Sequence, residues 1–413
     1  MSPRPSNWPA VLAVATATFT VVTSEMLPVG LLTPLAGALD VSEGTAGLTM
    51  TVPGLVAAVA APTVVRTTRR LDRRRVLVAL TALLVLANLV SALAPNIAVL
   101  LAARVLVGVS IGGVWAVAVP ATARLVTGPS AARANATVFS GIAVASVLGV
   151  PLGTWAGGLA GWRAAFVGGA VLAAVAGAAL AAALPALPPV KAAPGGLRSA
   201  PGVRLGLLTV GALVAGHFAA YTYVRPLLEQ VGGLTEGSIG VLLLVYGVAG
   251  VVGNFVAGTR AAKSPNKTVL AIIVSLGAVL LATPLLARGL IGSTVVLVAW
   301  GLAYGGVSVG TQVWLFAIAP GARETVSAML SAVFNTAIAA GALAGGVAAD
   351  AISVPAAVWL GAGLVAVALL TAARAVSRRP RPAAHTPSAP QGALDPARRL
   401  SPTAAAPSGP PRR

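Results

Sequence analysis

The sequence predicts an all-α membrane protein with twelve transmembrane helices in two pseudo-symmetric six-helix bundles. Its 413 residues are 57% hydrophobic and only 9% charged, whereas soluble globular proteins carry about 25% charged residues. Apolar runs of roughly 20 residues, the length that spans a bilayer, recur along the chain. The charged residues lie mainly in the gaps between these runs, and basic gaps alternate with gaps that hold little or no base. Such alternation is typical of a multi-pass membrane protein.

The first half contains six apolar segments separated by short polar gaps. We expect them near 9–32, 45–65, 76–94, 98–120, 136–158 and 164–184. The first gap holds Asp40 and Glu43 without a basic residue, whereas six arginines lie between Arg66 and Arg75 in the second. The third and fifth gaps hold at most one basic residue, and the fourth is basic again.

The second half repeats this arrangement. Its segments are expected near 205–225, 238–258, 268–287, 290–316, 326–349 and 355–374. Its first gap is acidic, with Glu229 and Glu236, and its second is basic. The run Gly108-Val109-Ser110-Ile111-Gly112 recurs as Gly306-Val307-Ser308-Val309-Gly310. Two halves that repeat in the same direction indicate parallel bundles about an axis along the membrane normal.

The domain boundaries follow from these segments. We expect an N-terminal bundle over 1–184, a cytoplasmic linker over 185–204 and a C-terminal bundle over 205–375. Residues 376–413 are rich in Arg, Pro, Ala and Ser, which predicts a disordered basic tail. Because the even-numbered gaps are basic, they and both termini should lie in the cytoplasm of a bacterial cell.

Several classes of function find no support in the sequence. The net charge of +19 lies in gaps and tail, which indicates membrane topology rather than nucleic-acid binding. There is no cysteine, no G-x-x-x-x-G-K-[ST] loop and no catalytic constellation. We therefore expect neither an enzyme, a metal site nor a cofactor, and the expected energy source is the proton gradient. The expected partners are a small-molecule substrate and the lipid bilayer, and the chain should be a monomer.

Two charged residues lie well inside apolar segments. An ionisable group at membrane depth costs roughly 2.5–3.5 kcal/mol on insertion scales, so Glu25 predicts a functional site. Pro28, Gly30 and Pro34 follow it and loosen the backbone. We assign proton coupling to Glu25 and Arg104. The alternatives are a structural hydrogen bond for Glu25 and, for Arg104, bracing of unwound backbone through its carbonyls.

Further polar residues are candidates for lining a substrate cavity. His217, Tyr221 and Arg225 recur at i, i+4 and i+8, which predicts one helical face. Interhelical hydrogen bonding and aromatic anchoring would explain this stripe equally well. The remaining candidates, each of which could instead bond a neighbouring helix, are Asn88, Gln312 and Asn335.

Small residues and prolines predict close helix packing and gating. Glycines at intervals allow two backbones to approach, and a proline adds a bend. The residues in this group are Gly112, Gly113, Gly149, Pro151 and Gly153.

Several motifs that contain these residues resemble motifs of the Major Facilitator Superfamily, in its twelve-helix drug:proton antiporter branch. Arg104 followed by Gly108, Gly112 and Gly113 is similar to that family's fourth-helix motif, in which a buried arginine is linked to proton coupling. Gly149-Val150-Pro151-Leu152-Gly153 resembles its fifth-helix antiporter motif. Within the family, purine ribonucleoside efflux pumps and their sugar- and chloramphenicol-efflux relatives are most similar, through Leu27-Pro28-Val29, Gly161-Trp162-Arg163 and Tyr223-Val224-Arg225-Pro226.

One cytoplasmic loop departs from the family pattern. Arg69 stands where the family places an Asp, and Asp72 stands where it places a Gly. The following Asp72-Arg73-Arg74 nevertheless resembles the purine-efflux branch. The resemblance implies a secondary transporter that exports a small organic solute, such as a drug or a purine nucleoside, by proton antiport. The alternatives are a proton-coupled importer of the same fold and a non-transporting membrane sensor or scaffold.

Overall fold

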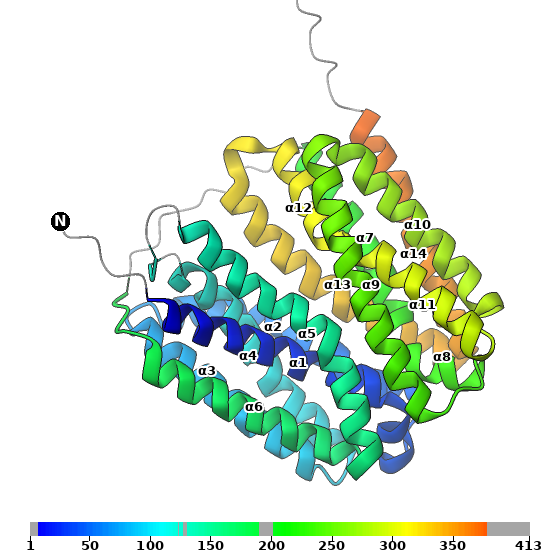
Figure 1. Ribbon diagram of the computed structural model, residues 1–413, viewed down its shortest axis with the longest axis horizontal. Coiled ribbons are helices and arrows are strands. Elements are labelled where there is room, and N and C mark those ends of the chain that lie inside the picture. Colours follow the sequence, from blue (N-terminus) through cyan, green and yellow to red (C-terminus); the bar gives the residue numbers. More distant parts are fainter. Residues whose placement is uncertain (1–6, 123, 127–129, 190–200, 378–413) are drawn as a thin grey trace, which may run out of the picture. The chain divides into compact units, whose positions relative to one another are not determined.

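A computed structural model describes residues 7–122, 124–126, 130–189 and 201–377 of the chain (Figure 1). The helices of the first half are α1 Trp8–Leu39, α2 Glu43–Thr67, α3 Arg73–Leu93, α4 Ile97–Thr122, α5 Ser130–Ala160 and α6 Trp162–Ala183. Those of the second half are α7 Pro201–Tyr221, α8 Val224–Gln230, α9 Glu236–Lys263, α10 Pro265–Leu286, α11 Gly289–Gly305, α12 Val307–Ile318, α13 Arg323–Ala351 and α14 Val354–Ser377, with a 3-10 turn at Pro320–Ala322.

The described part of the chain is an all-α, multi-pass membrane protein, as predicted. Eleven of its helical segments are long and apolar enough to cross a bilayer, when α11 and α12 are counted as the single span Gly289–Ile318. A shorter apolar stretch, Val147–Ala160, lies in α5. The predicted tail lies outside the described residues from 378 onward.

The predicted segment 205–225 is wrong in one respect, because its helix does not continue to Arg225. The helix α7 ends at Tyr221, and α8 begins at Val224 after a turn in which the Tyr223 amide donates to the Ala220 carbonyl. Pro226 lacks an amide hydrogen and could not donate to the Thr222 carbonyl in a continuous helix, whereas in the first turn of a new helix no such bond is required. His217 and Tyr221 therefore share a helix, but Arg225 does not belong to it.

Two other boundaries differ from the prediction. The segment 290–316 is interrupted at Gly306, where α11 ends and α12 begins. The helix α7 already begins at Pro201, so the last residues assigned to the linker are helical. A glycine at the end of α11 fits the interruption, since glycine weakens a helix interior.

Each half packs mainly against itself. In the first half α1 packs against α5, α2 against α4 and α3 against α6, and in the second half α7 packs against α13 and α14, and α9 against α11. The two halves meet where α2 contacts α13 and α5 contacts α9. The core of the second half continues across this interface into α1, α2 and α5, through Val29, Leu32, Ala36, Ala46, Met50 and Val150.

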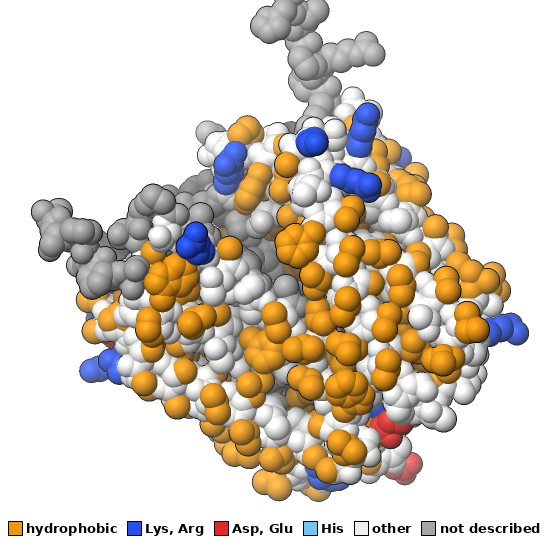
Figure 2. Space-filling model, in the orientation of Figure 1, with side chains coloured by type: hydrophobic (Ala, Val, Ile, Leu, Met, Phe, Trp, Pro, Cys, Tyr) orange, Lys and Arg blue, Asp and Glu red, His pale blue; other side chains and the backbone are white. Residues whose placement is uncertain are grey.

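The outer surface is strongly apolar, as a lipid-facing surface must be. Large hydrophobic side chains such as Phe255 (69% exposed) and Ile291 (81% exposed) point outward. Figure 2 shows hydrophobic side chains over most of the visible face, with several lysines and arginines near its upper edge and acidic side chains near its lower right. The end of the bundle that holds Asp40, Glu43, Glu229, Glu236 and Asp350 is called the acidic end below.

Candidate functional site

The site is built around two prolines inside α1. In an α-helix each carbonyl accepts a hydrogen bond from the amide four residues later. Pro28 and Pro34 have no amide hydrogen, so the carbonyls of Ser24 and Gly30 lose their partners within the helix. A buried carbonyl without a donor is costly in a membrane, so each needs a donor from elsewhere. Both receive one from an arginine.

Arg104 of α4 donates a hydrogen bond to the first of these carbonyls, that of Ser24. Its Nη1 donates to the Ser24 carbonyl at 2.9 Å, and its Nη2 donates to Ser91 Oγ of α3 at 3.2 Å. The guanidinium is fully buried and stacks over the Phe166 ring at 4.8 Å, while its Nε has no partner among the described residues. This geometry is the backbone bracing that the sequence left open as an alternative role for Arg104.

Glu25 is the next residue after Ser24, whose carbonyl accepts from Arg104. Its side chain is only 5% exposed, yet none of the described residues forms a hydrogen bond or close ion pair with it. The positive charge of Arg104 acts on it without a direct contact. With respect to the described residues, this buried carboxyl group can therefore take up or release a proton without breaking a hydrogen bond or an ion pair.

Arg225, which belongs to the second half of the molecule, donates to the second carbonyl, that of Gly30. Its Nη1 donates to the Gly30 carbonyl at 2.6 Å, and Thr154 Oγ1 of α5 donates weakly to the same carbonyl at 3.3 Å. Its remaining nitrogens pair with Glu229 at 2.9 Å and Glu236 at 2.8 Å. Each of the three nitrogens of Arg225 thus has a partner at the interface of the halves.

Polar contacts between the halves gather at the acidic end. Besides the Arg225 bond, Ser42 Oγ donates to Asp350 at 2.6 Å and the Gly44 amide donates to the same carboxylate at 2.8 Å. Gln230 donates to Glu43 at 3.1 Å. Asp350 thereby caps the start of α2 from the opposite half. Among the described residues, no hydrogen bond between the halves is found away from this end.

A set of stacked rings lies inside the second half, and we call it the aromatic column. It runs from Tyr304 (α11) through His217 and Tyr221 (α7) to Tyr246 (α9), with successive ring centroids 3.3, 5.0 and 4.8 Å apart. Trp300 Nε1 donates to His217 Nδ1 at 3.1 Å. Because indole can only donate, the neutral imidazole carries its proton on Nε2, which has no partner among the described residues.

The other predicted lining residues occupy different positions. Asn88 is fully buried and donates to Ser24 Oγ at 3.0 Å, so it supports the Arg104 cluster rather than lining an open cavity. Asn335 donates to the Ser331 carbonyl of its own helix at 2.9 Å. Gln312 is partly buried on α12.

The predicted packing glycines lie at helix contacts. A Cβ on Gly113 would meet Leu80 of α3 at 2.6 Å, and one on Gly112 would lie 2.9 Å from the Ala61 amide nitrogen of α2. On α5, Gly149 and Gly153 face α1, with the nearest atoms belonging to Thr23 and Leu27 respectively. Pro151 lies between these two positions, inside α5.

The residues Asp72, Arg73 and Arg74 form the start of α3. Asp72 is its N-cap and accepts from the Arg74 amide at 2.8 Å and from the Leu187 amide at 3.1 Å. Arg73 donates to the Thr68 carbonyl at 3.3 Å, and Arg74 donates to the Ala181 carbonyl. These contacts lie within the first half and tie the end of α6 to the loop before α3.

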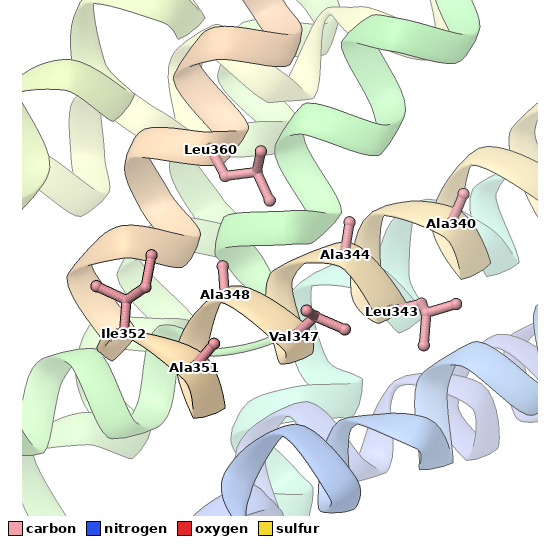
Figure 3. Close-up of a pocket in the computed structure, with 8 residues that line it drawn as sticks. All are labelled: Ala340, Leu343, Ala344, Val347, Ala348, Ala351, Ile352 and Leu360. Atoms are coloured by element: carbon pink, nitrogen blue, oxygen red, sulfur yellow. The ribbon is translucent and has the colours of Figure 1, made fainter.

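A large groove elsewhere lacks the chemistry of a solute site. It has a volume of about 540 Å³ and lies along α13 and α14, between Ala340 and Leu360 (Figure 3). Every side chain that lines it is aliphatic, and Val347 and Ile352 are 62% and 77% exposed. We interpret it as lipid-facing surface. The described residues also contain no group of three or more metal-ligating side chains.

Comparisons with known proteins point to one family. Residues 14–320 and 207–408 match the profile of the Major Facilitator Superfamily. The chain is 34% identical over 383 residues to the transcription regulatory protein OpdE of Pseudomonas aeruginosa (91% of this chain, 95% of that protein). It is 32% identical over 373 residues to the purine ribonucleoside efflux pump NepI of Escherichia coli strain K12 (89% and 94%).

Solved structures show the same fold. A bacterial homologue of the human lysosomal transporter Spinster, inward-facing and occupied, has a TM-score of 0.76 at 15% identity, with 91% of this chain and 97% of that chain covered. The nucleoside transporter NupG has a TM-score of 0.70 at 13% identity, covering 89% and 100%.

Proposed function

Since the chain belongs to the Major Facilitator Superfamily and is a membrane transporter by fold and relatives, we propose that it exports a purine nucleoside or a similar small solute in exchange for protons. The proposed location is the bacterial cytoplasmic membrane, with both termini in the cytoplasm. The observation that carries the proposal is Glu25 of α1, a buried carboxyl group that has no hydrogen-bond partner among the described residues. The NepI similarity supports the solute class and the outward direction.

The contacts at the acidic end support alternating access. The positive-inside rule places that end outside the cell, because the arginine-rich gaps lie at the other end. Closure at the outer end corresponds to an inward-facing state, from which the bundles would rock to open outward. Proton and solute then exchange when each favours a different state or competes for the same site.

Everted membrane vesicles test this function. A pH gradient is first formed across the vesicles, and adenosine is then added. We expect adenosine to dissipate the gradient for the wild type and not for Glu25→Gln. The matched control is Asp40→Asn, which removes an exposed carboxylate in a left-handed cap that asparagine tolerates. A proton-coupled importer would not dissipate the gradient, and exchange that survives in Glu25→Gln would remove the role of that residue.

A regulatory membrane protein is the second candidate, because the Pseudomonas aeruginosa relative carries the name of a transcription regulatory protein. A purely regulatory role predicts no solute flux through the purified protein. Proteoliposomes that contain this chain alone therefore separate the two candidates, since nucleoside uptake driven by an imposed pH gradient requires a transporter.

A further inference from the structure

The aromatic column has one end that is less enclosed than the rest. His217 is fully buried, and Tyr221 and Tyr246 are 5% and 7% exposed. Tyr304 is only partly buried, although His217 covers one face of its ring at 3.3 Å and 8°. The other ring near Tyr304, Phe218, is closer to His217 (4.9 Å) than to Tyr304 (6.2 Å), so no ring among the described residues covers the outer face of Tyr304, the one that points away from His217.

This end of the column is held rigidly. A Cβ on Gly301 would lie 2.9 Å from Ala249, and Gly305 packs against the backbone of Gly250, so α11 approaches α9 closely on both sides of Tyr304. The bond from Trp300 to His217 fixes the ring beneath it. The helix α11 ends one residue after Tyr304. Interrupted helices at membrane depth are tolerated where they are buried in protein or line a cavity.

Glu25 of the opposite half lies within electrostatic range of the Tyr304 hydroxyl. Its helix is joined to the second half one to two turns further along, where Arg225 donates to the Gly30 carbonyl at 2.6 Å, so the carboxylate and this ring belong to the same part of the interface. An ionised carboxylate only accepts hydrogen bonds. A solute between these two groups is therefore recognised by a flat face on one side and by N–H or O–H groups on the other.

We propose that the outer face of Tyr304 is the docking surface for a flat, nitrogen-rich aromatic ring, which extends the aromatic column by one member and donates a hydrogen bond to Glu25. This inference rests on the proposed transport function and names the chemistry of its solute. Purine bases meet both requirements, because every base has a stacking face and its ring edge or exocyclic amine can donate. Sugars and aliphatic amphiphiles have no such face.

Equilibrium binding of radiolabelled adenosine to the purified full-length protein in detergent tests the proposal. Tyr304→Leu should weaken binding by about fivefold to a hundredfold, the range that base–aromatic stacking supplies. Tyr304→Phe keeps the ring and should stay within about threefold of the wild type. Phe255→Leu makes the same aromatic-to-aliphatic change on the lipid-facing surface and should leave binding unchanged. Equal unfolding midpoints for the Tyr304 variants would show that the leucine variant is folded.

Several results would overturn this assignment. Adenosine binding that is absent in the wild type, or equal in Tyr304→Leu and wild type, removes the docking surface. An equal loss in Tyr304→Phe and Tyr304→Leu would mean that the hydroxyl rather than the ring is recognised. Failure of the transport function is distinguishable: adenosine would then bind in a Tyr304-dependent manner while adding it to everted vesicles leaves the pH gradient intact.

Discussion

The pairing of Arg104 with the carbonyl that Pro28 frees predicts a measurable coupling between the two residues. In Pro28→Ala, the new amide can donate to the Ser24 carbonyl within α1, so this carbonyl no longer depends on Arg104. Arg104→Met in the Pro28 background instead leaves the carbonyl without its donor. A hydrogen bond to a charged group contributes about 1.5–3 kcal/mol, and an orphaned buried acceptor costs about 1–3 kcal/mol. We expect Arg104→Met to cost about 1–2 kcal/mol less in the Pro28→Ala background, within this range.

A double-mutant cycle on the free energy of unfolding measures this coupling. Each variant is unfolded reversibly with a denaturing detergent in mixed micelles. The cost of losing the contact to Ser91 and the effect on Glu25 occur in both backgrounds, so they cancel in the cycle. Additivity within about 0.5 kcal/mol would contradict the reasoning, because it would mean that the arginine and the proline-freed carbonyl stabilise the protein independently.

Two further predictions concern the interface of the halves and the packing of the second half. The chain has no native cysteine, so Ala46→Cys, at a fully buried position on the interface side of α2, is a single reporter of opening at the acidic end. Arg225→Gln should raise its labelling rate by a membrane-impermeant maleimide about tenfold, equivalent to 1.4 kcal/mol, and an unchanged rate would mean that the Gly30 bond does not hold this end closed. Gly345→Leu should destabilise the protein by about 1–3 kcal/mol, because its Cβ would press on the Ala219 backbone. Gly363→Leu has open space around its Cβ and should leave the unfolding midpoint unchanged.

Much of the architecture follows from composition, because length and hydropathy decide which segments can span a bilayer. The interruptions at Tyr223 and Gly306 were not predicted, since the composition of an apolar run is the same whether its helix is continuous or broken. Pro226 gave a usable signal for the first interruption. The adjacent pair Gly305-Gly306 gave a weaker one for the second.

The candidate site was predicted only in part. A charge inside an apolar run is visible in the sequence, so Glu25 and Arg104 could be found, and the i, i+4 spacing placed His217 beside Tyr221. Tyr304 was missed because its neighbours in the column come from helices distant in the chain. The partners of the arginines had a local signal, since the carbonyl four residues before any proline in a helix needs an outside donor.

The two arginines bind α1 on either side of Glu25 in the sequence: Arg104 binds the Ser24 carbonyl, and Arg225 binds the Gly30 carbonyl. Arg104 and Ser24 belong to the same bundle, so their bond persists when the bundles move relative to one another. Arg225 belongs to the opposite bundle and keeps two carboxylate partners of its own after it leaves Gly30. The Thr154 hydroxyl of the first bundle, which donates to the Val150 carbonyl at 2.9 Å and lies 3.3 Å from the Gly30 oxygen, can then turn its proton to the Gly30 carbonyl. Separation of Arg225 from Gly30 would therefore leave neither this guanidinium without a carboxylate partner nor the Gly30 carbonyl without a donor. In the proposed rocking cycle, the Ser24 carbonyl would keep its bond to Arg104 and the Gly30 carbonyl would change its donor, so α1 could take part in both states.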